Sequence, residues 1–102
     1  MKTLLPNYNS PQELKLFLES HGLAMHKRFG QNFLVNENAR KSIADSLTVD
    51  EGTSVWEVGP GLGAMTFELL KRNARLTVFE IDKGFLNLLR IFFSSYIDSG
   101  ML

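Results

Sequence analysis

A run of alternating glycines is the feature that most constrains how this chain can fold. Residues 57–64 read Glu-Val-Gly-Pro-Gly-Leu-Gly-Ala and join an apolar segment at 55–58 to an amphipathic segment at 64–72. The first segment predicts a short buried strand and the second a helix. Glycines at such a junction permit positive φ angles and let a ligand approach the main chain closely. The pattern indicates a nucleotide or nucleoside cofactor site at the carboxyl end of a parallel strand.

A second predicted strand, residues 76–81, carries an acid near its end. Glu80 lies about 20 residues after Gly59, where a carboxylate accepts hydrogen bonds from ribose hydroxyls. The spacing leaves the cofactor open. The first two glycines with Ala64 fit the dinucleotide fingerprint of NAD enzymes, and the three glycines together equally fit the loop of S-adenosylmethionine-dependent methyltransferases. A tight turn without any ligand is the third reading of the loop.

Three further helices are predicted. The first begins at Ser10, the N-cap of a capping box, and ends at Gly22. The second begins at Asn36 and runs to about residue 47, and the third spans about residues 85–96. Strands that alternate with helices in this way indicate an α/β fold with a parallel sheet. Four apolar residues are expected to form the inward face of the second helix: Ala39, Ile43, Ala44 and Leu47.

Composition narrows the function classes. The chain has 102 residues, no cysteine and two histidines, so neither disulfides nor a zinc site with thiolate ligands is expected. Its formal charge is +0, which by itself gives no support for nucleic-acid binding. No segment resembles a signal peptide or a membrane span, and we expect a cytoplasmic protein without metal or membrane partners. Two strands make a poor sheet, so open sheet edges are expected.

Three segments in order resemble the ribosomal RNA adenine dimethyltransferase family. They are residues 27–34 (Lys-Arg-Phe-Gly-Gln-Asn-Phe-Leu), the glycine loop through residue 66, and residues 79–82 (Phe-Glu-Ile-Asp). Within the family they look more like the small-subunit enzyme. The resemblance implies an incomplete Rossmann-like class I methyltransferase fold, with parallel strands and flanking helices behind an N-terminal helix. It divides the chain into a helical extension, residues 1–24, and the truncated N-terminal part of the cofactor-binding domain, residues 25–102.

The resemblance also implies a site for S-adenosyl-L-methionine. By this likeness Glu80 holds the ribose, with Asp82 as the alternative acid, and Gly59 lies against the methionine portion. Glu57, directly before the loop, either orients the cofactor's amino end or caps the following helix. On loop chemistry alone, the two amide side chains at 31 and 32 could equally be loop stabilisers. The remaining members of the implied cofactor site are Asn32, Leu34, Gln31 and Gly61.

The family dimethylates N6 of adenosines in small-subunit rRNA, so the resemblance implies a partner in that RNA or a ribosomal precursor. Its Asn-Leu-Pro-aromatic motif, which aligns the target amine, does not occur in this sequence. We therefore assign no catalytic residue, and we expect a fragment with cofactor-site residues but no turnover alone. Two alternatives stay open: an NAD-binding oxidoreductase fragment, and a non-catalytic interaction module.

Overall fold

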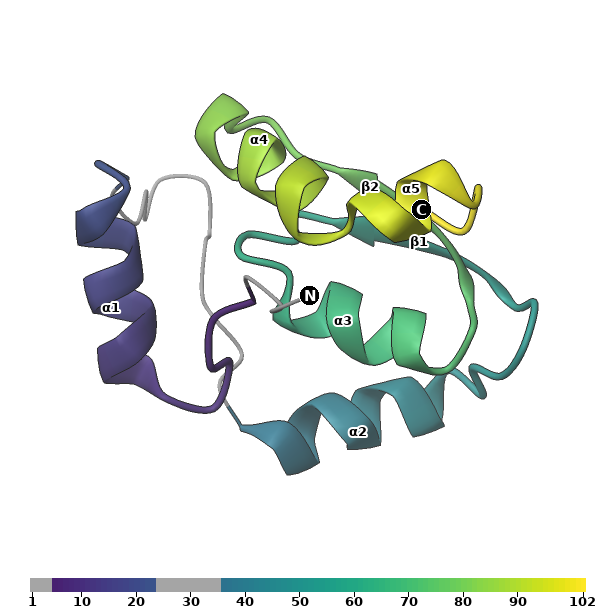
Figure 1. Ribbon diagram of the computed structural model, residues 1–102. Coiled ribbons are helices and arrows are strands. Elements are labelled where there is room, and N and C mark those ends of the chain that lie inside the picture. The colour runs from purple at the N-terminus through teal and green to yellow at the C-terminus, as the bar shows by residue number, and fades with distance from the viewer. Residues whose placement is uncertain (1–4, 24–35) are drawn as a thin grey trace.

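The structure is a computed structural model of the chain, and it describes residues 5–23 and 36–102. Within these residues the order of elements is helix, helix, strand, helix, strand, helix, helix, which confirms the predicted α/β class. In Figure 1, α4, α3 and α2 lie one below the other, with α1 to one side. The bounds are α1 Pro11–Ser20, α2 Glu37–Ser46, β1 Ser54–Val58, α3 Ala64–Lys71, β2 Arg75–Phe79, α4 Lys83–Phe92 and α5 Ser94–Asp98.

The two strands form a parallel pair, in the register Ser54 with Arg75 through Val58 with Phe79. The sequence predicts the second strand at 76–81. The observed strand β2 begins one residue earlier, at Arg75, and ends two residues earlier, at Phe79. The amide of Leu76 donates to the carbonyl of Met101 at 2.8 Å. Because neighbouring amides of a strand point to opposite sides, Met101 lies along the edge of β2 that faces away from β1.

Within residues 5–23 and 36–102, helices cover one face of this sheet and leave the other bare. Its inward residues Val55 and Val78 pack against a core that α2, α3, α4 and the strands share. The outward residues are open: Trp56 is 77% exposed and Val58 is 83% exposed. The prediction of a buried strand at 55–58 is thus wrong for every second residue, because no described element covers the other face. The indole of Trp56 packs edge-on against the ring of Phe79, with 5.7 Å between their centroids.

The inward face of α2 also differs from the prediction. Arg40 and Ala44 are its buried residues, whereas Ile43 is 42% exposed and Leu47 is 52% exposed. A guanidinium occupies the inner face because it reaches the N-terminal segment, where it donates to the side-chain oxygen of Asn9. Helical periodicity located the helix correctly, but of the four residues expected on its inward face only Ala44 is fully buried.

The helix predicted at 85–96 is interrupted at Phe93. Helix α4 begins earlier than expected, because the Asp82 side chain accepts a hydrogen bond from the amide of Phe85 and caps it. Phe93 has φ −115° and ψ 27°, and its side chain is fully buried in the shared core. The chain bends there and continues as α5.

Helix α1 packs beside the glycine loop. Its buried residues Leu14 and Leu18 join a second apolar cluster with Leu62 from the glycine loop and with Phe85 and Leu88 from α4. Ser10 caps the helix by accepting from the amide of Glu13 at 3.2 Å, as the sequence predicts. Among the described helices, none has both the length and the apolar character required to span a membrane.

Candidate functional site

The glycine loop leaves β1 with three residues in the left-handed region: Gly59 at φ +70°, Gly61 at +58° and Gly63 at +91°. Residues with a Cβ disfavour this conformation, which explains why glycine occupies every second position of the loop. The amide of Gly59 still bonds the sheet, donating to the carbonyl of Phe79 at 2.8 Å. A Cβ added at Gly59 would meet no atom of the described residues within 4 Å, so among these residues this part of the loop borders open space.

The carboxylate of Glu80 ties the end of β2 to this loop. One oxygen accepts from the amide of Gly61 at 3.1 Å, and the other accepts from the amide of Asp82 at 2.9 Å. A carboxylate offers about four acceptor positions, so each oxygen retains capacity for a further donor. The predicted loop and the predicted acid therefore meet at one place, the carboxyl end of the strand pair. Asp82, the alternative acid, is engaged as the cap of α4.

Glu57 points inward from β1 and contacts α3. Its carboxylate accepts a 2.6 Å hydrogen bond from the hydroxyl of Thr66, which is fully buried. Burial raises the pKa of Glu57 above its ordinary value, the Thr66 hydrogen bond opposes this shift, and the negative charge of Glu80 adds to it. The helix-cap alternative for Glu57 is wrong, since Gly63 is the N-cap of α3 and no side chain caps it.

The far end of the loop is packed as tightly as the near end is open. A Cβ built on Gly63 would lie 2.7 Å from Cε2 of Phe93 and 2.9 Å from Cδ2 of Leu89. The absence of a side chain at Gly63 thus allows the core of α4 to approach the start of α3. Gly59 and Gly63 therefore share a positive φ angle but differ in surroundings, because Gly59 faces open space and Gly63 faces the core.

The structure places three of the six predicted cofactor residues, Gly59, Gly61 and Glu80, at one locus. The other three, Gln31, Asn32 and Leu34, lie outside the described residues. Sequence reasoning missed Thr66 as the partner of Glu57, and it missed Tyr8, whose hydroxyl donates to the carbonyl of Leu62 inside the loop. No local motif signals either contact, because both depend on elements that meet only after folding.

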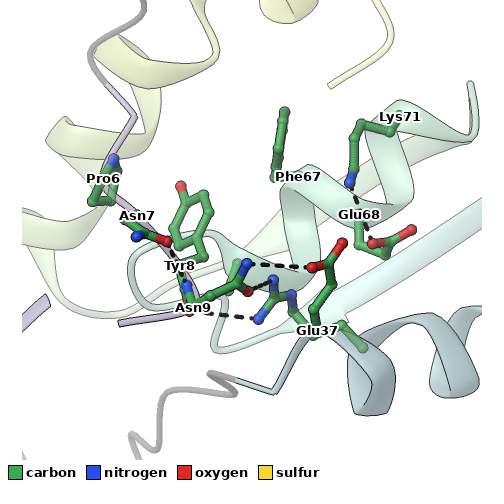
Figure 2. Close-up of a pocket in the computed structure, with 10 residues that line it drawn as sticks. Pro6, Asn7, Tyr8, Asn9, Glu37, Phe67, Glu68 and Lys71 are labelled. Carbon is green, nitrogen blue, oxygen red and sulfur yellow. Dashed lines mark hydrogen bonds and ion pairs between the residues drawn. The ribbon is translucent and has the colours of Figure 1, made fainter. Parts of the chain in front are cut away.

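A polar pocket of about 220 Å³ lies on another side of α3. Figure 2 shows residues 6–9 facing Phe67, Glu68 and Lys71, with Glu37 of α2 below them. Neither Gly59 nor Glu80 lines it, so this pocket is separate from the junction of the loop and the acid. In the described part of the chain, no three residues of the metal-ligating types gather as a metal site would require.

A parallel strand pair with helices on one face, and a glycine loop bonded to a strand-end carboxylate, define a partial Rossmann-like α/β fold of the class that binds nucleotide or nucleoside cofactors. The chain belongs to the family described as ribosomal RNA adenine dimethylase, whose sequence profile matches residues 22–98. This match confirms the family that the three sequence segments resemble.

Curated relatives agree with this family. The chain is 59% identical over 88 residues to ribosomal RNA small subunit methyltransferase A of Treponema denticola, covering 86% of this chain and 30% of that protein. It is 47% identical over 92 residues to the protein of the same name in Treponema pallidum, covering 90% and 32%. For Borreliella burgdorferi the values are 50% over 76 residues, 74% and 27%. The chain thus spans about a third or less of the length of these relatives.

Proposed function

We propose that this chain carries part of the S-adenosyl-L-methionine site of an enzyme that dimethylates adenosine N6 in small-subunit rRNA. The observation that carries the proposal is the 3.1 Å hydrogen bond from the amide of Gly61 to the carboxylate of Glu80, in a chain of this family. The names of the relatives support the RNA substrate. The reaction is expected in the cytoplasm, where ribosomal RNA resides.

The residues present fit an adenosyl cofactor. Glu80 has acceptor capacity left for ribose hydroxyls, and the space beside Gly59 lets a ligand reach the backbone. The backbone of Gly61 would lie near the same ligand, because its amide donates to the carboxylate of Glu80. Asn32, Leu34 and Gln31 remain predicted contacts from the preceding segment.

When bound, S-adenosylmethionine supplies an electrophilic methyl group on a sulfonium, so the protein needs mainly to orient the amine and exclude water. In this chain Glu80 and the glycine backbone would orient the nucleoside end. The sequence contains no Asn-Leu-Pro-aromatic motif to hold the target amine. We propose that the chain as it stands binds cofactor without transferring methyl groups.

Equilibrium dialysis of the 102-residue chain against labelled S-adenosylmethionine tests the binding proposal, with NADH as the competing ligand. We expect retention of the methyl donor and of S-adenosylhomocysteine, and no retention of NADH. Glu80→Gln keeps the shape of the side chain but removes its charge, and it should weaken binding about tenfold or more, as loss of a charge-assisted hydrogen bond does. Glu51→Gln, at an exposed turn, is the matched control for charge.

Three results would contradict this assignment. Preference for NADH would support the oxidoreductase alternative, and retention of neither ligand would support an interaction module. Methyl transfer from the labelled donor to small-subunit rRNA by this polypeptide would overturn the proposal that it does not transfer methyl groups by itself.

A further inference from the structure

The N-terminal segment before α1 is fastened to the body of the protein. Arg40 of α2, itself buried, donates to the side chain of Asn9 and to the carbonyl of Tyr8, the latter at 3.5 Å. The amide side chain of Asn9 in turn donates to Glu37 at 3.3 Å. Figure 2 shows Tyr8 and Asn9 beside Phe67 and Glu37, between α3 and α2. These contacts set the direction of the chain at Tyr8.

From this position Tyr8 reaches into the glycine loop. Its hydroxyl donates to the carbonyl of Leu62 at 2.8 Å, across 54 positions of sequence. Tyr8 is 5% exposed and Leu62 is 1% exposed, so no water is expected to replace the bond. The ring of Tyr8 also packs on Phe67 of α3, with 6.0 Å between the ring centroids. The ring is therefore located independently of the hydroxyl.

The charge state of Tyr8 suits a donor. Burial raises the pKa of Tyr8 well above its ordinary value, opposed by the positive charge of Arg40 and reinforced by the negative charge of Glu57. A tyrosine hydroxyl already carries its proton at physiological pH, and this one donates it to the Leu62 carbonyl. Removing it would leave a buried carbonyl without its donor, in the middle of the loop.

We propose that Tyr8 is a positioning residue for the cofactor loop: its hydroxyl holds the peptide carbonyl of Leu62, and so fixes the backbone of Gly61 and Gly63 on either side. Two backbone bonds flank this point, from Gly61 to Glu80 and from Gly63 to the carbonyl of Pro60 at 2.9 Å. Tyr8 lies outside residues 22–98, the span that the family profile matches. The part of this inference that concerns cofactor affinity rests on the proposed function.

The test is Tyr8→Phe, which removes one oxygen and keeps the ring against Phe67. Amide hydrogen exchange of the free 102-residue chain is measured at Gly61 and Gly63, followed by dialysis with S-adenosylhomocysteine. We expect exchange at these two amides to accelerate roughly fivefold, as for loss of one buried hydrogen bond, and affinity to fall by a similar factor. Amides in α2 should keep their wild-type rates.

Tyr96→Phe is the matched control, because it removes the same oxygen from a tyrosine that lies on α5 with its ring against Phe93. It should change neither measurement. Asn9→Ala is a second variant that acts upstream, since it loosens the segment that carries Tyr8 without altering the tyrosine. It should accelerate exchange at Gly61 and Gly63 less than Tyr8→Phe does, and it remains informative if the tyrosine variant fails to fold.

The outcomes separate the two proposals. Unchanged exchange at the loop in Tyr8→Phe, or acceleration spread evenly over the whole chain, would overturn the positioning role whether or not the wild type binds cofactor. Local acceleration together with unchanged affinity would overturn its link to the cofactor. If exchange accelerates locally in Tyr8→Phe but the wild-type chain binds no cofactor, the proposed function is refuted. The positioning of the loop by Tyr8 would still stand.

Discussion

At the scale of single residues, Gly59 and Gly63 separate two reasons for a glycine. Both adopt positive φ, which costs another residue about 1–2 kcal/mol. Only Gly63 is also enclosed, with Phe93 and Leu89 less than 3 Å from where its Cβ would be. Gly59 instead borders the space beside the Glu80 carboxylate that we assign to the cofactor. Stability and ligand binding should therefore respond differently at these two positions.

We expect Gly63→Ala to lower the free energy of unfolding by about 2–5 kcal/mol, the sum of backbone strain and overpacking. Gly59→Ala should cost about 1–2 kcal/mol, because only the backbone term applies. Cofactor affinity should show the opposite order, with the larger loss in folded Gly59→Ala. Thermal melts and dialysis check this pair. Equal melting temperatures for the two variants would contradict the tight packing around Gly63.

The raised pKa of Glu57 predicts a pH dependence of stability. Below the ordinary glutamate value of 4.5 the group is protonated in both folded and unfolded chains and has no effect. As pH rises through that value toward the higher folded pKa, the unfolded state loses its proton first, and stability falls. Glu57→Gln should therefore gain in melting temperature relative to wild type on going from pH 4 to pH 7.

Glu51→Gln is the control for the loss of one negative charge, since Glu51 lies in an exposed turn. A Glu57→Gln chain whose advantage over wild type shrinks as pH rises would show that the carboxylate is stabilised, rather than destabilised, in the fold.

At the scale of elements, the residue at which a helix starts depends on local sequence, whereas the face that it buries depends on the rest of the fold. Ser10, Asn36 and Asp82 each accept a hydrogen bond from a backbone amide three residues later, as N-caps do. A cap needs only its own turn, so it can be predicted from a short stretch of sequence. The inner face of α2 depends on what lies beneath it, and there Arg40 takes a buried position because Asn9 and Tyr8 supply acceptors.

Asn36→Ala tests the cap of α2. The side chain of Asn36 is exposed and accepts from the amide of Ala39 at 2.9 Å. Its loss should cost about 1 kcal/mol, which lowers the melting temperature of a chain of this size by about 4–8 °C. Asn36→Asp preserves the acceptor and should melt within a few degrees of wild type. Equal losses in both variants would argue against the cap as the cause.

At the scale of the whole molecule, the covered and bare faces of the sheet set its behaviour in solution. Trp56, Val58 and Ile81 are each more than 70% exposed, and Phe79 is 47% exposed. Phe92 and Phe93, by contrast, lie in or against the core, so the most exposed large apolar side chains gather on or just after the strands. Contiguous apolar surface of this kind favours association.

Val58→Lys should raise the highest concentration at which the chain is still monomeric by analytical ultracentrifugation. It should change the free energy of unfolding by only about 0.5 kcal/mol, as surface substitutions do. Lys83→Arg, on exposed α4 surface, conserves charge and serves as the control. Iodide should quench Trp56 fluorescence strongly in the monomer. An indole shielded from iodide in a monomeric sample would contradict the bare sheet face.

The sequence by itself determined the alternation of helices and strands, the caps at Ser10 and Asn36, the positive φ angles of the loop and the family, because each of these depends on short segments. It also predicted that Gly59, Gly61 and Glu80 belong together, since parallel strands end at a common edge. Only the tertiary structure decided which face of each element is buried: Trp56 outward, Arg40 inward, Phe93 at a break between helices. It alone brought Tyr8 to Leu62 and Thr66 to Glu57, because burial and side-chain pairing are set by what packs against a residue, and neighbours distant in sequence leave no periodic trace.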